Sequence, residues 1–274
     1  VARVDGSVWG SLTLIDVRLA DNESEIARIP RLKVNYALLP LIWGRIQILR
    51  LEAAQPLVWL KEGRDGVWNI VEALLPVEPQ SETPSLVVAI SSVELQNADV
   101  DISFSRSSYR LTGLDLQGTA GIREDLITVD LRQVSSRVVT KGMPEARVKG
   151  ALAYEDSRGR ESLKFSDFFI ESGSSGLKLT GKINDLKSFE TEAKVSIDRL
   201  TSADIAHFVP QWPVKANVSG TADVRGPLTA LKGDFSLSVA DGSLAGSFQA
   251  DVTSESPAYQ GRVKIAQVNL AKLL

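Results

Sequence analysis

The side chains that carry most enzyme mechanisms are scarce in this sequence. Its 274 residues include no cysteine and a single histidine, His207. Without cysteine the chain can form no disulfide, no thiolate nucleophile and no cysteine-ligated zinc or iron–sulfur centre. One histidine also excludes a multi-histidine metal site. The immediate neighbours of His207 are apolar and include no Ser, Cys or second His that would give it a catalytic role.

Two short patterns resemble chemical sites, and both are better explained as strands. The segment Gly176 to Lys182 reads GLKLTGK, like a phosphate-binding loop, but Ile183 stands where Ser or Thr would ligate Mg²⁺. Its leucines alternate with polar residues, which indicates a strand. Asp99 and Asp101 form the polar side of another alternating segment. We therefore predict that the chain is not an enzyme and has no catalytic residues, no metal site and no cofactor.

Charge and composition exclude further classes. The chain has 31 Lys and Arg against 34 Asp and Glu, a net charge of −3, so we expect no nucleic-acid partner. Its 43% hydrophobic and 24% charged residues are typical of a folded globular protein. The longest apolar stretch, Ala37 to Trp43, is far shorter than the ~20 residues that cross a bilayer. We therefore expect a folded chain without a transmembrane helix.

Alternation of apolar and polar residues, the period of a β-strand, is the dominant pattern. The clearest runs lie at 98–104, 214–225, 235–239 and 244–252, and shorter ones at 32–36, 127–131, 177–179, 195–197 and 263–265. Asp241-Gly242 is suited to a type I′ hairpin turn between two of these strands. The apolar parity shifts within 14–17 and within 48–51, which predicts a bulge or bend at each place.

Helical signals are few and short, and none can cover a large sheet. They lie at Ala37 to Gly44, at Asn69 to Leu75 with Asn69 as a possible N-cap, and at Thr201 to Val209, which Pro210 ends. The fold class predicted from these patterns is all-β.

The chain is predicted to divide near residue 80. The segment 76–85 contains three prolines and two glutamates and is predicted to be an exposed linker or loop. It separates an N-terminal module, 1–75, from a region of stacked strands, 86–274. A weak repeat between 194–205 and 262–273 favours a modular β-architecture.

An amphipathic strand exposes an apolar stripe that must be covered by a second sheet, by closure of its own sheet or by an apolar ligand. The strand pattern alone does not decide between an ordinary sandwich or barrel and a sheet that binds an apolar ligand. The five Trp residues leave a similar choice, because they suit either core packing or a position at a bilayer interface.

A more specific pattern opens the chain. It reads RVDGSVWGSLTL at 3–14, VRLAD at 17–21, IARIP at 26–30, LKVNY at 32–36, Leu38-Leu39 and WGRI at 43–46. Further segments of the same kind are QPLVWL at 55–60 and parts of 220–274. These segments resemble the region that follows the membrane anchor in the TamB branch of the AsmA-like family.

The resemblance implies a periplasmic protein of a Gram-negative bacterium, anchored in the inner membrane by an N-terminal helix. In that family a C-terminal domain meets TamA, an outer-membrane barrel of the BamA type. Both the anchor and this domain are expected to lie outside the given sequence, which would then be an N-terminal periplasmic fragment, truncated at its C-terminal end. The implied fold is an elongated antiparallel β-taco, or half-pipe, with an apolar groove and a few short helices.

The implied function is bridge-like phospholipid transport, in which acyl chains occupy the groove between inner and outer membrane. The expected groove residues are the apolar residues of the alternating strands: Val100, Ile102, Phe104, Val218, Val224, Phe235, Leu237, Val239, Phe248, Val263 and Ile265. Bulky residues of the N-terminal module are expected close to the membrane: Trp9, Leu38, Leu39, Leu41, Ile42, Trp43 and Trp59.

Two other functions remain open at this point. One is an assembly factor for outer-membrane barrels and autotransporters, which would offer its sheet edges to a nascent strand by β-augmentation. The other is a structural domain that binds no ligand. A lipid groove needs apolar residues that continue along one face across many strands, whereas augmentation needs a bare edge.

Overall fold

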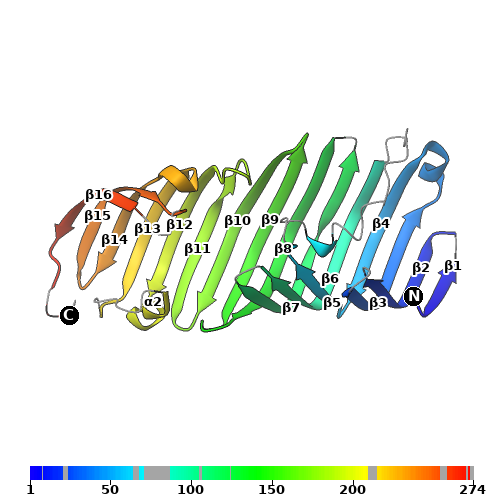
Figure 1. Ribbon diagram of the computed structural model, residues 1–274, viewed down its shortest axis with the longest axis horizontal. Helices are drawn as coiled ribbons and strands as arrows, with labels where there is room; N and C mark the ends of the chain where they lie inside the picture. The colour runs from blue at the N-terminus through cyan, green and yellow to red at the C-terminus, as the bar shows by residue number, and fades with distance from the viewer. Residues whose placement is uncertain are drawn as a thin grey trace. The chain divides into compact units, whose positions relative to one another are not determined.

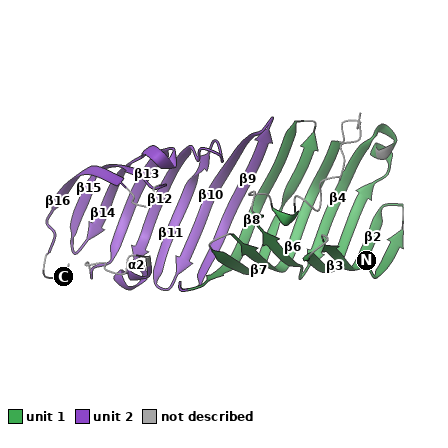
Figure 2. Cartoon of the chain, in the orientation of Figure 1, with its two compact units in different colours: residues 1–141 green, residues 142–274 purple. Residues whose placement is uncertain are grey.

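The computed structural model describes residues 1–7, 9–20, 24–63, 68–70, 87–104, 107–123, 125–208, 215–253, 258–269 and 271. These residues form strands, the turns between them and a few short helical segments, which confirms the predicted all-β fold class. The chain divides into two compact units, residues 1–141 (unit 1) and residues 142–274 (unit 2) (Figure 2).

The described part of unit 1 is a mostly antiparallel sheet (Figure 1). Its strands are β1 (Arg3–Ser7), β2 (Ser11–Ala20), β3 (Glu25–Ala37), β4 (Arg45–Ala54), β5 (Leu57–Lys61), β6 (Val87–Ser103), β7 (Ser108–Arg123) and β8 (Leu126–Thr140). They lie in the order β1-β2-β3-β4-β6-β7-β8, while β5 pairs with β3 and β6.

The long strand β6 lies parallel to two strands in turn. Its first part pairs with β4 and its last residues pair with β5. β5 therefore continues the path of β4 beyond a break at Gln55, whose φ is +52°, and at the fully buried Pro56. The predicted linker, 76–85, lies outside the described residues, and the division placed there stays a prediction.

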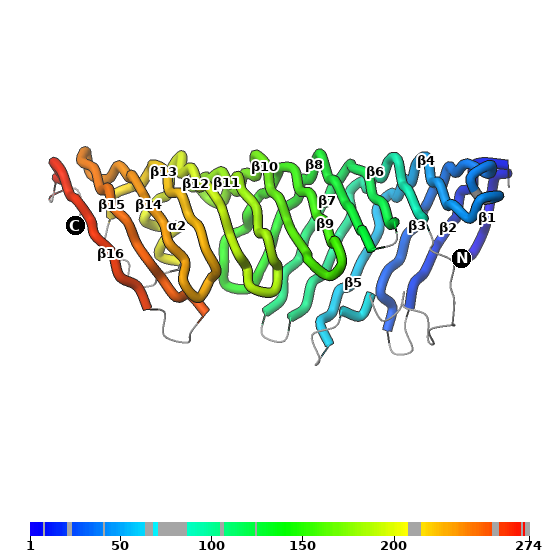
Figure 3. Tube along the Cα trace, turned by 90° about the horizontal axis from the view of Figure 1, so that it is seen from above, coloured from blue at the N-terminus to red at the C-terminus, as the bar shows by residue number. Residues whose placement is uncertain are grey.

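Unit 2 consists of antiparallel strands that follow one another in chain order (Figure 3). The strands are β9 (Ala146–Ser157), β10 (Arg160–Ser172), β11 (Ser175–Ile183), β12 (Thr191–Leu200), β13 (Val218–Gly226), β14 (Leu231–Val239), β15 (Gly242–Asp251) and β16 (Ala258–Ala266). A short helix, α2 (Ser202–Phe208), follows β12, and a 3₁₀ turn, η2 (Leu228–Ala230), precedes β14.

The helix predictions are partly confirmed. The first is a 3₁₀ segment, η1 (Leu39–Trp43), and the third is α2. Of the second, only Asn69 and Ile70 fall among the described residues, and both are helical. The strand predicted over 214–225 starts instead at Val218, because its neighbours β12 and β14 have their last paired residues opposite that position.

The strands are irregular at both places where the parity shifts predicted a bulge or bend. At the first, Asp16 has a φ of +50°, while the register with β3 is the same on both sides of it, so that no residue is inserted there. At the second shift the register between β3 and β4 leaves Leu49 unpaired. The same left-handed conformation occurs within β6 and β10, at Asn97 (φ +50°) and Asp167 (φ +46°). Asn and Asp tolerate this conformation better than other non-glycine residues, and bulges bend and twist a strand.

The hairpin turn lies one residue earlier than the sequence indicated. Ala240 and Asp241 have φ values of +47° and +62°, as the two central residues of a type I′ turn do, and Gly242 begins β15. A Cβ on Gly242 would lie 2.5 Å from the backbone nitrogen of Val268 and 2.6 Å from the carbonyl oxygen of Ala266. Gly242 is therefore required because the backbone at the end of β16 and just after it, at residues 266–268, approaches it closely, and not because of the turn.

Buried apolar side chains are few. Among the described residues they are Pro56 together with Ile26, Ala27, Ala53, Ala98, Val100, Leu114, Val134 and Val239. A two-layer fold buries the inner faces of both layers. In the part of the chain that the structure describes, each unit is instead a single layer of strands, as a half-pipe requires and a sandwich does not have.

One glycine in unit 2 provides a test of this strand packing. Gly220 has a φ of +139°, and a Cβ there would lie 2.8 Å from Cα of Leu237, so we expect Gly220→Ala to lower the free energy of unfolding by about 1–3 kcal/mol. Urea unfolding followed by circular dichroism measures this.

Gly176→Ala in β11 is the matched control, because a Cβ there meets no atom within 4 Å. Its effect should stay within about 0.5 kcal/mol. Equal losses for the two variants would contradict the packing described here.

Candidate functional site

The predicted groove residues of unit 2 lie on one face of the sheet. Residues opposite each other on neighbouring strands point to the same face. Val218 is opposite Val239, and Leu237 is opposite Leu244, which is itself opposite Ile265. The alternation of each strand therefore continues into the next.

The remaining predicted residues join the same face through glycines. Phe235 is opposite Gly246, and that glycine is opposite Val263. Val224 and Phe248 are both opposite Gly233. All eight groove residues predicted for unit 2 thus share one surface, which we call the apolar face of unit 2.

This face continues across β9 to β12, where the sequence analysis named no groove residues. Register connects Val224 to Ala193 in β12 and Ala193 to Gly181 in β11. From there the face carries Ile197, Val195, Leu179, Leu177, Ile170, Phe168, Phe165, Leu152 and Val148. The sequence analysis recognised short alternating runs in β11 and β12 but none in β9 or β10, and the two short runs did not establish which parity faces the same way as β13.

Large rings on the apolar face of unit 2 lie over glycines of neighbouring strands. A Cβ on Gly233 would lie 2.5 Å from Cε1 of Phe248, and one on Gly150 would lie 2.6 Å from Cδ2 of Phe168. Aromatic rings that cover a glycine on the next strand shield its exposed backbone. The rings therefore spread apolar surface between strands.

The groove residues predicted for unit 1 also share a face. Val100 and Ile102 lie between β5, where they pair with Val58 and Leu60, and β7. Ile102 is opposite Tyr109 on β7. We call this surface the apolar face of unit 1.

An aromatic cluster stands at the end of β6. The ring of Phe104 makes edge-to-face contacts with Trp68, at a centroid distance of 5.2 Å, and with Tyr109, at 5.9 Å. The sequence analysis named Phe104 as a groove residue but not its two partners. Trp68 is held near β5 by a bridge to Glu62, and the spacing in the chain does not reveal such a contact.

Both apolar faces contain partly exposed residues. Val100 and Val239 are 7% and 4% exposed, but Phe104, Val263 and Ile265 are 41%, 55% and 69% exposed. Exposure is highest on β16, which pairs only with β15 among the described strands. Large apolar side chains therefore meet solvent where no layer of described residues covers them.

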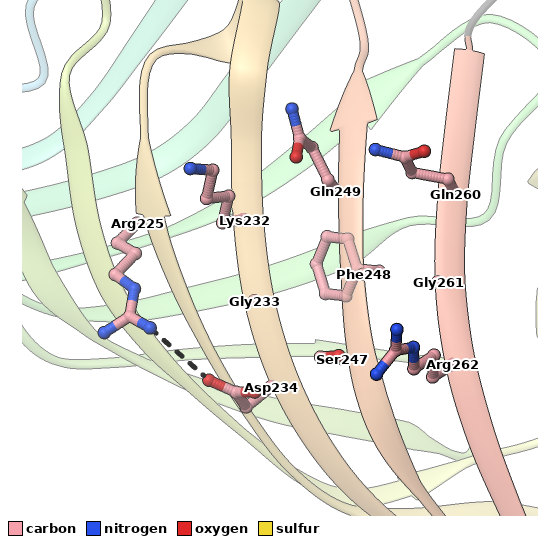
Figure 4. Close-up of a pocket in the computed structure, with 10 residues that line it drawn as sticks. All are labelled: Arg225, Lys232, Gly233, Asp234, Ser247, Phe248, Gln249, Gln260, Gly261 and Arg262. Atoms are coloured by element: carbon pink, nitrogen blue, oxygen red, sulfur yellow. Dashed lines mark ion pairs between the residues drawn. The ribbon is translucent and has the colours of Figure 1, made fainter.

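The opposite face of unit 2 is polar. Arg225, Lys232 and Arg262 surround an open hollow of about 490 Å³ with Asp234, which lies 3.7 Å from Arg225 (Figure 4). Ser236 lies on this polar face too, between Thr221 and Ala245. The two faces therefore differ sharply in polarity, as the alternating sequence requires.

Four of the residues predicted to lie near a membrane are strongly exposed at one end of unit 1. Trp9, Ile42 and Trp43 are 82%, 74% and 71% exposed, and Leu39 is exposed as well. The turn that carries Trp9 is held to the end of β3 by a hydrogen bond of 2.9 Å from the backbone nitrogen of Tyr36 to the carbonyl oxygen of Gly10. η1 follows β3 directly and so lies at the same end.

The other three predicted membrane-proximal residues differ. Leu38 is half-buried, and the side chain of Leu41 lies outside the described residues. Trp59 is half-buried on β5, which pairs with Ala27 at the opposite end of β3. The structure therefore does not bring Trp59 to the exposed cluster.

A carboxylate holds α2 onto unit 2. Asp204 Oδ2 accepts hydrogen bonds from Ser175 Oγ and Thr201 Oγ1, both at 2.6 Å. It also accepts one from the backbone nitrogen of Ser174 at 3.3 Å. The hydrogen bonds from Ser175 and Thr201 lower the pKa of Asp204 below its ordinary value. The sequence analysis did not single out this residue, although Thr201-x-x-Asp204 has the spacing of a helix-capping pair.

The two segments that resemble chemical sites in the sequence lie in strands, as their alternation predicted. Residues 176–182 belong to β11, and Lys182 pairs with Glu192 at 3.4 Å. Asp101 pairs with Arg110, and Asp99 accepts a hydrogen bond of 3.1 Å from the backbone nitrogen of Gly113. No group of three or more His, Cys, Asp and Glu side chains among the described residues is placed to hold a metal ion. None of the described helices has the length and apolar character needed to span a bilayer.

Comparisons with known proteins give no relative for this chain. No family model matches it, and no match was found among curated proteins or solved structures. The family resemblance in the sequence thus stays an expectation.

The hydrogen bonds of Asp204 lead to a pH-dependent prediction. Asp204→Asn should lower the free energy of unfolding at pH 7 by about 1–2 kcal/mol. Because the folded-state pKa is lowered, the carboxylate stabilises the fold above its unfolded pKa of about 4 and loses that effect as the pH falls through the folded pKa.

The difference between wild type and variant should therefore shrink in urea titrations performed at progressively lower pH. Asp198→Asn, at an exposed position of β12, is the control and should change little. A wild-type advantage that stays constant down to pH 2 would refute the role given to Asp204.

The exposed cluster at Trp9 and Trp43 gives a second test. Tryptophan emission should shift to shorter wavelength when phospholipid vesicles are added, because an indole ring prefers the interface to water. The Trp9→Phe/Trp43→Phe double variant should lose the shift, and Trp59→Phe should keep it. A shift that survives in the double variant would count against a membrane contact at this end.

Proposed function

We propose that this chain is a passive conduit for phospholipid, in which acyl chains lie against the apolar faces of its sheets. The observation that supports the proposal is the partly exposed apolar face: residues from every strand between β9 and β16 share one surface, and of the large apolar side chains named on it only that of Val239 is buried. No chemical step is part of this function.

The energetics suit binding without a deep trap. Each methylene group that leaves water for an apolar surface contributes about 0.8 kcal/mol. Rings that lie over glycines, such as Phe248 over Gly233, extend apolar surface over strands that lack a side chain there, so that neighbouring strands offer an acyl chain similar apolar contact. A chain can then move from strand to strand while its head group stays in solvent.

The alternative, the capture of a nascent strand, needs a bare strand edge. Among the described strands β16 pairs only with β15, and it carries Arg262 and Lys264, whose charges oppose pairing with a foreign strand. The family resemblance adds the setting of the proposal: a periplasmic protein anchored in the inner membrane and acting with TamA, through regions beyond this sequence.

Charges placed on the two faces test the proposal. Leu237→Asp and Ile102→Asp put an unpaired carboxylate on the apolar faces, where its desolvation costs several kcal/mol. After incubation with phospholipid vesicles, the lipid that co-purifies with each variant should fall by about tenfold or more, as measured by mass spectrometry.

Ser236→Asp and Ser103→Asp are the matched controls one residue away, on the polar faces, and should retain the wild-type amount. Circular dichroism would verify that all four variants are folded. Equal losses on both faces, or a protein strand in place of co-purifying lipid, would overturn the proposal in favour of an assembly factor.

A further inference from the structure

Helix α2 borders a small, partly open pocket on the apolar face of unit 2. The pocket has a volume of about 320 Å³ and is lined by Pro144, Ile170, Leu177, Leu200 and Ile205 together with four small or polar residues. Ile170, Leu177 and Leu200 come from β10, β11 and β12, while Ile205 comes from α2. The pocket therefore lies between α2 and this part of the apolar face.

The polar side chains that line the pocket already have partners. Ser172 Oγ donates a hydrogen bond of 3.2 Å to the carbonyl oxygen of Glu145, and Ser175 Oγ donates one of 2.6 Å to Asp204. Because these groups are already paired, they offer few hydrogen bonds to a water or a polar ligand in the pocket. A buried water needs two to four polar partners, and a polar ligand whose groups stay unpaired binds less favourably. The lining thus selects a ligand without hydrogen-bonding groups.

Charge sets the direction in which such a ligand enters. Asp204 is the one ionisable residue in the lining, and its carboxylate accepts three hydrogen bonds that favour the charged form. An anionic head group inside the pocket would meet this like charge after losing its own water. The end of the ligand that enters is therefore the uncharged end.

We propose that the pocket beneath α2 binds one unbranched alkyl chain, methyl end first, and so forms a holding point on the conduit. The proposal rests on the function proposed above, because Ile170 and Leu177 belong to the same apolar face. It adds a site where residues of α2 and of the apolar face line the same pocket, with Ile205 on the helix and Ile170 and Leu177 on the sheet.

Stearate that carries a nitroxide locates the pocket directly in the wild-type chain. The δ1 methyl groups of Ile170 and Ile205, observed by NMR after selective isotope labelling, should broaden strongly when the nitroxide is on carbon 16. With the nitroxide on carbon 5 the same methyl groups should broaden much less. Equal broadening by the two probes, or none by either, would overturn the proposal.

A variant that fills the pocket gives an independent measurement. Leu177→Phe should weaken the binding of unlabelled stearate about tenfold. Thr180→Phe adds a ring to the polar face of the same strand, β11, away from the pocket, and should leave stearate affinity within about twofold. Equal affinity for the two variants would contradict the assignment, and the NMR measurement needs no variant if Leu177→Phe fails to fold.

The outcomes separate this proposal from the proposed function. If Leu237→Asp reduces co-purifying phospholipid but stearate leaves the Ile170 and Ile205 methyl groups unaffected, the conduit stands and the pocket assignment fails. If stearate occupies the pocket but charges on the apolar face do not change the amount of phospholipid, the pocket is a separate alkyl site and the conduit fails.

Discussion

In both units, the register between neighbouring strands decides which side chains share a face of the sheet. A slip of one residue between two strands would move every apolar side chain of one strand to the other face. The chain avoids this over many consecutive pairings, so that Leu237, Leu244 and Ile265 stay in line. Where a strand does gain a residue, as at Leu49, the parity of its own sequence changes at the same point. Register and alternation are therefore matched throughout.

A single layer with this register must be stabilised differently from an ordinary core. Few apolar side chains are buried, and several of these are alanines. Backbone hydrogen bonds between strands and contacts between cross-strand side chains must supply much of the stability. The ring of Phe168 over Gly150 and that of Phe248 over Gly233 are contacts of this kind. The same contacts make the apolar face available to a ligand.

Much of this arrangement could be predicted from the sequence because the period of two is a local property. The faces of Val218, Leu237 and Phe248 follow directly from alternation, and so do the irregularities at Asp16 and Leu49. The features that were missed depend on residues distant in the chain. Asp204 on α2 contacts Ser175 at the start of β11, 29 residues earlier, and Trp68 contacts Phe104, 36 residues later in the chain. No pattern within a window of ten residues reveals such contacts.

The hairpin succession of unit 2 has a consequence for how such a protein changes in length. Among the described strands, each one from β10 to β15 pairs only with its two sequence neighbours, so its contact order is low and its stability is close to a sum over neighbouring pairs. Insertion or deletion of two consecutive strands leaves the direction and parity of all others unchanged. Evolution can thus lengthen or shorten the sheet by whole hairpins without redesigning either face, in the way that solenoid proteins vary their number of repeats.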